Sequence, residues 1–65
     1  MIPADSSAIA EIGWEKGVLA IRFHSRREPY FFPNVLEQLF KEFQNAPSLG
    51  KFFHERIKDN YLPLP

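Results

Sequence analysis

The stretch Tyr30–Phe43, YFFPNVLEQLFKEF, constrains the fold of this chain more than any other. It opens with an aromatic run typical of a strand, and Pro33 ends that run. After Pro33 the apolar residues recur at helical spacing on one face, as Val35, Leu36, Leu39, Phe40 and Phe43. Asn34 and Glu37 have the spacing of a capping box, so we expect a helix that begins at Asn34 and reaches about Asn45.

Alternating apolar residues predict strands before this stretch. The clearest strand is Val18–His24, in which Leu19, Ile21 and Phe23 share one face. An earlier strand is expected over Ala8–Trp14, with Ile9 on the same face as Glu11. Tyr30–Phe32 supplies a third strand. Because short turns join the three strands, we expect an antiparallel meander.

A second helix is expected after Pro47, capped by Ala46 or Ser48 and reaching about Asn60. Residues 1–7 are expected to form a loose lead-in, and the prolines of the tail 62–65 cannot continue a helix. The predicted fold class is therefore α+β, a single domain over 1–65 in the order β-β-β-α-α, with both helices on one face of the sheet. The expected core is Ile12, Leu19, Ile21, Phe23, Tyr30 or Phe32, Leu36, Leu39, Phe40, Phe43, Phe52, Phe53 and Ile57.

Composition narrows the class of protein. The chain has 65 residues and no cysteine, so one small core must hold it together without disulfides or a thiolate metal site. Its N-terminal residues lack the charged and apolar regions of a secretory signal, and no apolar stretch approaches the roughly 20 residues of a membrane span. We therefore expect a cytoplasmic protein without a membrane partner.

A longer pattern runs through most of the chain. It reads Ser7-x-Ile9-x-x-Ile12-Gly13-Trp14, Leu19-x-Ile21-x-Phe23, Tyr30-x-Phe32, Asn34-Val35, and Ala46-x-Ser48-x-Gly50-x-Phe52-Phe53-x-x-x-Ile57-Lys58-x-x-Tyr61. This pattern resembles the KTSC domain family, named for the C-terminus of some lysyl-tRNA synthetases. The resemblance implies a free-standing bacterial or phage member of that family. Through the synthetase linkage it also implies RNA binding.

No sequence motif of catalysis, metal binding or cofactor binding is present. His24 and His54 belong to different predicted elements, and no nucleophile motif accompanies them. His54 and Glu55 are adjacent, so they face different ways on a helix. The three glycines do not form a phosphate-binding loop. We therefore expect a protein that is not an enzyme and that needs neither a cofactor nor a metal.

Basic and aromatic residues around the second and third strands form the candidate binding site. If these strands pair in register, Arg22 and His24 share a face with Phe31, and Arg26 and Arg27 lie in the adjoining turn. Such neighbours are typical of single-stranded nucleic acid recognition, in which cations meet phosphates and rings stack on bases. The predicted site for RNA or single-stranded nucleic acid consists of Arg22, His24, Arg26, Arg27, Tyr30, Phe31 and Lys51.

Two other interpretations stay open. In the first interpretation, the arginines are ordinary solubilising charges. The formal net charge of zero favours this interpretation, because nucleic-acid-binding proteins are commonly basic. In the second, the sheet face without helices presents Val18, Ala20 and Phe31. An exposed apolar face rimmed by charge is typical of a protein interface. A protein-interaction module, either a homodimer or a small binder of a host protein, is therefore the alternative function.

Overall fold

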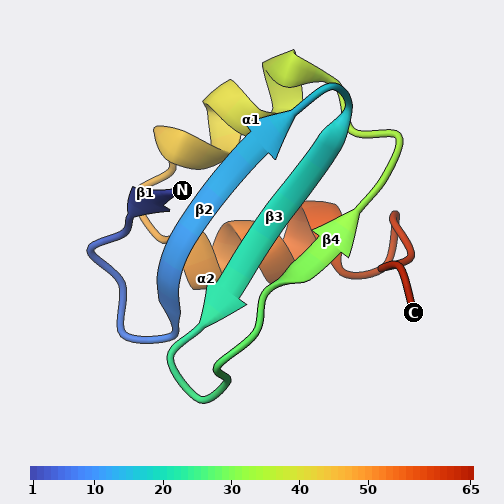
Figure 1. Cartoon of the computed structure of the whole chain (residues 1–65). Coiled ribbons are helices and arrows are strands. Elements are labelled where there is room, and N and C mark those ends of the chain that lie inside the picture. The colour runs from blue at the N-terminus through green and yellow to red at the C-terminus, as the bar shows by residue number, and fades with distance from the viewer.

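The computed structural model describes all residues from 1 to 65 and contains one sheet and a C-terminal helical layer. The elements are β1 (Ile2–Pro3), β2 (Ile9–Glu15), β3 (Val18–Phe23), β4 (Tyr30–Phe32), α1 (Glu37–Gln44), α2 (Leu49–Phe52) and the π-helix η1 (Phe53–Ile57). The strands pair antiparallel in the order β1-β2-β3-β4. Both helices lie behind the sheet in Figure 1, so one sheet face is covered and the other is open. The predicted α+β fold class is confirmed.

The sheet has a fourth strand that the sequence did not predict. Ile2 pairs with Ile12 along the edge of β2, and the Ala4 N–H donates to the carbonyl oxygen of Ala10 at 2.9 Å. A free strand edge offers unpaired backbone groups, and the N-terminal segment satisfies some of those on β2. The expectation of a loose lead-in over 1–7 is therefore wrong for Ile2 and Pro3.

A β-bulge in β2 brings Ile9 into the core. Ile9 pairs with Phe23 and Glu11 pairs with Arg22, so the register shifts between Ile9 and Glu11. The extra residue reverses the alternation, which places Ile9 on the face of Ile12 instead of that of Glu11. Ile9 is fully buried as a result. Strict alternation along the strand predicted that Ile9 shares a face with Glu11, and that prediction was wrong.

The core fills the space between the covered face and the helices. Its buried residues are Ile9, Ile12, Leu19, Ile21, Phe32, Val35, Phe43 and Ile57. The Trp14 indole packs against this core and donates its Nε1–H to the carbonyl oxygen of Val35 at 2.8 Å. This hydrogen bond fixes the chain between β4 and α1 against the end of β2.

Helix α1 begins three residues later than expected. Val35 is buried, and its N–H donates to the carbonyl oxygen of Gly17 at 2.9 Å, which holds the chain outside helical geometry. Asn34 has a φ of 64°, a left-handed conformation that asparagine tolerates better than most residues. Leu36 is then the N-cap residue without a side-chain cap, and it is 74% exposed. The predicted capping box at Asn34 and the core assignment of Leu36 are both wrong.

The second helix changes its hydrogen bonding partway. Ser48 caps α2, since its Oγ accepts from the Lys51 N–H at 3.3 Å, and Ser48 was one of the two predicted caps. From Phe53 the helix widens to π geometry, and the Lys58 N–H donates to the carbonyl oxygen of Phe53 at 2.8 Å. The regular helix expected to reach about Asn60 is therefore a short α-helix followed by a π-helix that ends at Ile57.

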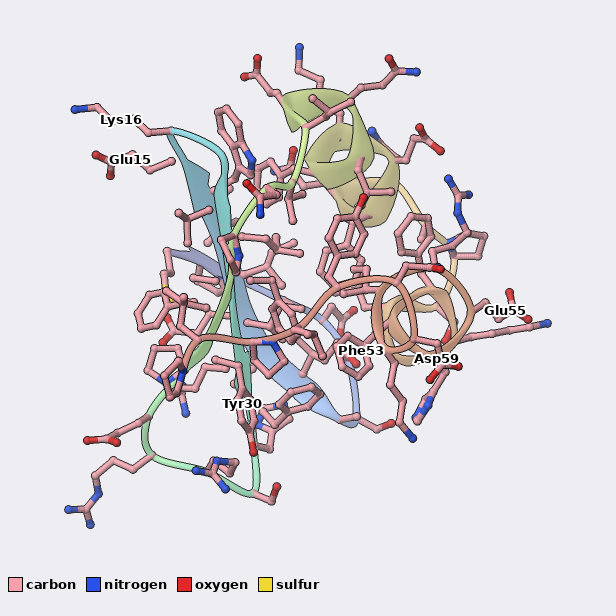
Figure 2. All side chains as sticks on the ribbon, turned by 90° about the vertical axis from the view of Figure 1, so that its right-hand side faces the viewer. Glu15, Lys16, Tyr30, Phe53, Glu55 and Asp59 are labelled. Atoms are coloured by element: carbon pink, nitrogen blue, oxygen red, sulfur yellow. The ribbon has the colours of Figure 1, made fainter.

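The C-terminal tail lies against the free edge of β4. The Leu64 N–H donates to the carbonyl oxygen of Phe31 at 2.7 Å. In Figure 2, which views the sheet from this edge, the C-terminal segment crosses from the helical side of the sheet to its open side. The tail thereby covers part of the β4 backbone that would otherwise be unpaired.

Candidate functional site

Four aromatic rings meet where the covered sheet face joins the π-helix. Ring-centre distances are 5.9 Å for Phe23–Tyr30, 6.4 Å for Tyr30–Phe32, 6.0 Å for Phe32–Phe53 and 5.2 Å for Phe53–Phe23, so the four contacts close a loop. Three of the four pairs are edge-to-face, the arrangement that the ring quadrupoles favour. We call Phe23, Tyr30, Phe32 and Phe53 the aromatic cluster. Figure 2 shows Tyr30 and Phe53 projecting from the sheet and the helix toward this junction.

Strand register explains why these rings converge. Tyr30 pairs with Ile21, which lies two residues before Phe23 on the same strand face, and Tyr30 and Phe32 share a face of β4. Phe53 is the first residue of η1 and reaches the cluster from the opposite layer. The cluster therefore joins both layers at the β4 side of the molecule.

Arg26 lies over the edge of this cluster. The turn after β3 is closed by the Arg26 N–H, which donates to the carbonyl oxygen of Phe23 at 3.0 Å. The guanidinium carbon of Arg26 then lies 4.7 Å from the centre of the Tyr30 ring. This distance is within the range of a cation–π contact, so the ring orients the guanidinium.

A hollow of about 360 Å³ opens beside the aromatic cluster. We call it the aromatic pocket; it is lined by Phe23, Ser25, Arg26, Tyr30, Phe32, Phe53, Lys58 and Pro63. Arg26 and Lys58 supply positive charge to its wall, and no acidic side chain lines it. The pocket therefore combines ring surfaces with uncompensated cations, which suits a flat ligand that carries negative charge.

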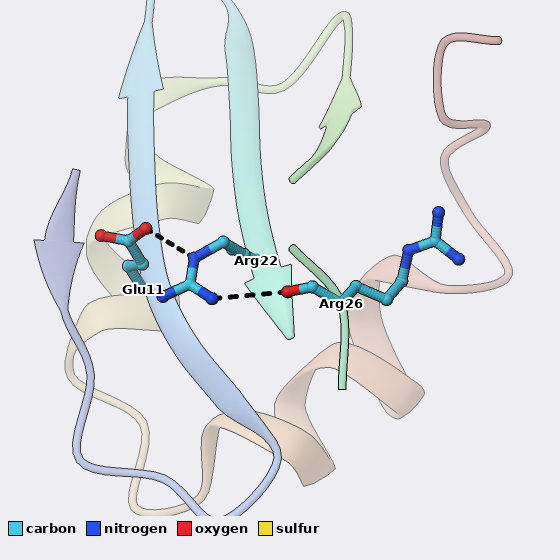
Figure 3. A network of polar contacts seen from close by, with 3 residues as sticks. All are labelled: Glu11, Arg22 and Arg26. Atoms are coloured by element: carbon cyan, nitrogen blue, oxygen red, sulfur yellow. Dashed lines mark hydrogen bonds and ion pairs between the residues drawn. The ribbon is translucent and has the colours of Figure 1, made fainter. Parts of the chain in front are cut away.

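Arg22 has a different environment on the open face. Its Nε donates to Glu11 Oε1 at 2.7 Å, and both side chains are about one-third exposed, at 31% and 30%. Figure 3 shows this pair bridging β2 and β3, while the Arg26 side chain extends away from it. The hydrogen bond from Arg22, together with its positive charge, lowers the pKa of the Glu11 carboxyl below 4.5. Most of the charge on Arg22 is thus already matched within the chain.

We expect this ion pair to make the protein less stable in acid. Because the pKa of Glu11 is lowered in the folded state, its stabilisation is present above pH 4.5 and is lost as the pH falls through the folded-state pKa. Thermal unfolding followed by circular dichroism should give a falling midpoint in that range. Glu11→Gln should flatten this fall. The matched control is Glu15→Gln, which removes an exposed carboxylate without an ion pair, and an equal effect of both variants would contradict the assignment.

Comparison with known proteins places the chain in a family. The model of the KTSC domain matches residues 5–61. The chain belongs to the KTSC domain family. The crystal structure of the KTSC domain protein YPO2434 from Yersinia pestis matches with a TM-score of 0.86 and 33% sequence identity, over 95% of this chain and 89% of that one. No curated protein matches the chain.

Within this KTSC domain, only part of the sequence-predicted site comes together. Arg26 and Tyr30 line the aromatic pocket, and Arg27 lies in the adjoining turn. Arg22 and Phe31 share the open face, as the predicted register required. His24 is exposed beyond the end of β3, and its Nε2 lies 2.9 Å from the Ser6 carbonyl oxygen. Lys51 is an exposed residue of α2 and does not line the pocket.

Six of the eight residues that line the pocket of this KTSC domain were not predicted as part of a site, and Phe53 and Lys58 are two of them. Phe53 was assigned to the core, and Lys58 was noted only within the family pattern. Both reach the pocket from the π-helical segment, which starts at Phe53 and is followed by Lys58. In the sequence, Phe53 and Ile57 have the spacing of residues on one face of a helix, but no residue pattern indicates a π-helix.

The structure of the KTSC domain shows no cluster of metal-binding side chains. No three His, Cys, Asp or Glu side chains cluster in a way that could hold a metal ion. The helices are also too short and too polar to cross a membrane. The aromatic pocket is therefore the site with the clearest chemistry for binding.

Proposed function

We propose that this KTSC domain is a non-catalytic module that binds RNA or single-stranded nucleic acid through the aromatic pocket. The observation that carries the proposal is the Arg26 guanidinium, which lies 4.7 Å from the Tyr30 ring centre, both residues lining a pocket without acidic side chains. An unpaired base can stack on an aromatic side chain or on a guanidinium plane. Both surfaces are adjacent here.

The cationic side chains around the pocket would bind the phosphate groups of the nucleic acid. Arg26 and Lys58 line it, and Arg27 lies in the turn next to Arg26. Neither Arg26 nor Lys58 forms an ion pair within the chain, so each remains able to bind an anion. Because the formal net charge is zero, the attraction is local, and we expect contacts to few phosphates. A chain without cysteine suits the reducing cytoplasm, where RNA is present.

Salt dependence gives a quantitative test of this proposal. If Arg26, Arg27 and Lys58 each contact one phosphate, the logarithm of the binding constant should fall with the logarithm of the salt concentration with a slope of about −2 for a single strand. The measurement is fluorescence anisotropy with a labelled single-stranded RNA of about ten nucleotides, within the site sizes of such proteins. The double variant Arg26→Ala/Lys58→Ala should bind more weakly, with a slope of about −0.7.

The matched control removes the same charge elsewhere. Lys16 lies in the turn between β2 and β3, and Lys41 lies on α1; both are exposed. Lys16→Ala/Lys41→Ala should keep the slope of about −2. Tyr30→Phe should retain binding because it keeps the ring, whereas Tyr30→Leu should lose the stacking energy of about 1–3 kcal/mol. Absence of binding at low salt, or equal losses in the two double variants, would contradict the proposal.

A further inference from the structure

The C-terminal tail, residues 62–65, supplies part of the wall of the aromatic pocket. Pro63 lines the pocket together with residues of β3, the following turn, β4 and the helical segment. In Figure 2 the tail passes along the β4 edge of the sheet, on the side of the molecule where Tyr30 and Phe53 meet. Pro63 is therefore the one lining residue that belongs neither to the sheet and its turn nor to the helical layer.

A single backbone hydrogen bond holds this tail to the sheet. The Leu64 N–H donates to the carbonyl oxygen of Phe31 at 2.7 Å, and no other backbone hydrogen bond joins residues 62–65 to the rest of the chain. Pro63 has no N–H to add to it. Leu62 and Leu64 are 86% and 52% exposed, so apolar burial contributes little to the attachment. A segment with so few buried contacts opens locally at a low cost in free energy.

The two anchors of the tail place Pro63 beside the pocket. Tyr61 packs against the core, and its N–H donates to the carbonyl oxygen of Ile57 at 3.1 Å, so local opening is confined to the residues after Tyr61. At the other anchor, Phe31 lies on β4 between Tyr30 and Phe32, which both line the pocket. The hydrogen bond to Phe31 therefore determines whether Pro63 stays at the pocket wall.

We propose that residues 62–65 form a strap that holds a nucleotide in the aromatic pocket, with Pro63 as the contacting residue. This inference rests on the nucleic-acid binding proposed above and adds a positioning residue to it. The proline ring is rigid and apolar, so it offers a fixed surface to a base or a sugar. A ligand that touches Pro63 stabilises the docked strap. Because linked equilibria are reciprocal, the docked strap raises the affinity for the ligand by the same factor.

Substitutions at Leu64 separate the hydrogen bond from the side chain. Leu64→Pro removes the N–H that holds the strap, whereas Leu64→Ala keeps it. In fluorescence anisotropy with the labelled single-stranded RNA, Leu64→Pro should raise the dissociation constant at least about fivefold, the lower end of typical couplings between sites. Leu64→Ala should bind like the unaltered chain. Pro63→Ala should also weaken binding, and its matched control is Pro65→Ala, because Pro65 belongs to the same tail and does not line the pocket.

Hydrogen exchange of the Leu64 amide, measured by nuclear magnetic resonance, gives a result that a merely structural role of the tail would not produce. Exchange requires the strap to open, so saturating RNA should slow it by the same factor by which Leu64→Pro weakens binding. The Ala4 amide is the internal control and should be unaffected, because its hydrogen bond to Ala10 lies along β2 at the other edge of the sheet.

The outcomes distinguish the strap from the pocket itself. Circular dichroism should show that all four variants are folded, since residues 62–65 contribute nothing to the core. If RNA binds the unaltered chain but Leu64→Pro binds as tightly as Leu64→Ala, the strap is wrong and the aromatic pocket stands. Unchanged exchange of the Leu64 amide in saturating RNA would lead to the same conclusion. Absence of RNA binding to the unaltered chain would overturn both proposals.

Discussion

Replacing Phe43 by Ala is expected to lower the free energy of unfolding by about 3–5 kcal/mol. Phe43 is fully buried on α1, and its ring stacks on Phe52 of α2 with the ring centres 5.3 Å apart. Its removal leaves a cavity where α1, α2 and the sheet meet, and a domain of this size has only a few kcal/mol of net stability. Urea denaturation followed by circular dichroism should show a largely unfolded variant even without denaturant.

The control for this prediction is Leu36→Ala. Leu36 precedes α1 and is exposed, so its truncation should change the free energy of unfolding by less than about 0.5 kcal/mol. If Phe43→Ala proved as stable as Leu36→Ala, α1 could not be packed as described. The sequence analysis also placed Phe40 and Phe53 in the core, but both are only partly buried, so we expect the larger effect at Phe43.

Replacing Ile57 by Ala should cost about 2–5 kcal/mol. Ile57 is fully buried, and it is the only buried residue of the π-helix. The wider helical turn directs Ile57 into the core, so this side chain fixes the position of Phe53 and Lys58 relative to the sheet. The same urea experiment measures the loss, and binding of the labelled RNA should weaken along with stability.

Glu55→Ala is the matched control for Ile57, because it lies in the same π-helix and is exposed. It should leave stability nearly unchanged. A small effect at Ile57 together with a large one at Glu55 would mean that the helix presents another face to the sheet. That result would also remove the structural basis of the aromatic pocket.

The sequence predicted the parts of this fold that depend on regular periodicity. Leu19, Ile21 and Phe23 alternate without interruption, and the structure places Leu19 and Ile21 in the core with Phe23 packed beside them. Ile9 broke the pattern, because a bulge adds one residue and no residue type announces it. Periodicity also could not show that Asn34 would be left-handed, since a tertiary hydrogen bond from Val35 to Gly17 determines that conformation.

The candidate site was predictable to a similar extent. Arg26 and Tyr30 are close in sequence and joined by one turn, so their proximity followed from the meander itself. Phe31 and Arg22 share the open face as the register required, but the sequence did not show that Glu11 would pair with Arg22. Lys58 reaches the pocket through the π-helix, which depends on packing against the sheet and leaves no local signal.

Nuclear magnetic resonance of the ¹⁵N-labelled protein, titrated with a short single-stranded RNA, tests the central claim most directly. We predict that the backbone amide signals of the turn 25–28, Tyr30, Phe53 and Lys58 shift on binding, whereas the signals of α1 do not move. No shift at low salt would contradict nucleic-acid binding. Shifts confined to Gly13, Ala20 and Phe31 would contradict the aromatic pocket as its site and place the ligand on the open face.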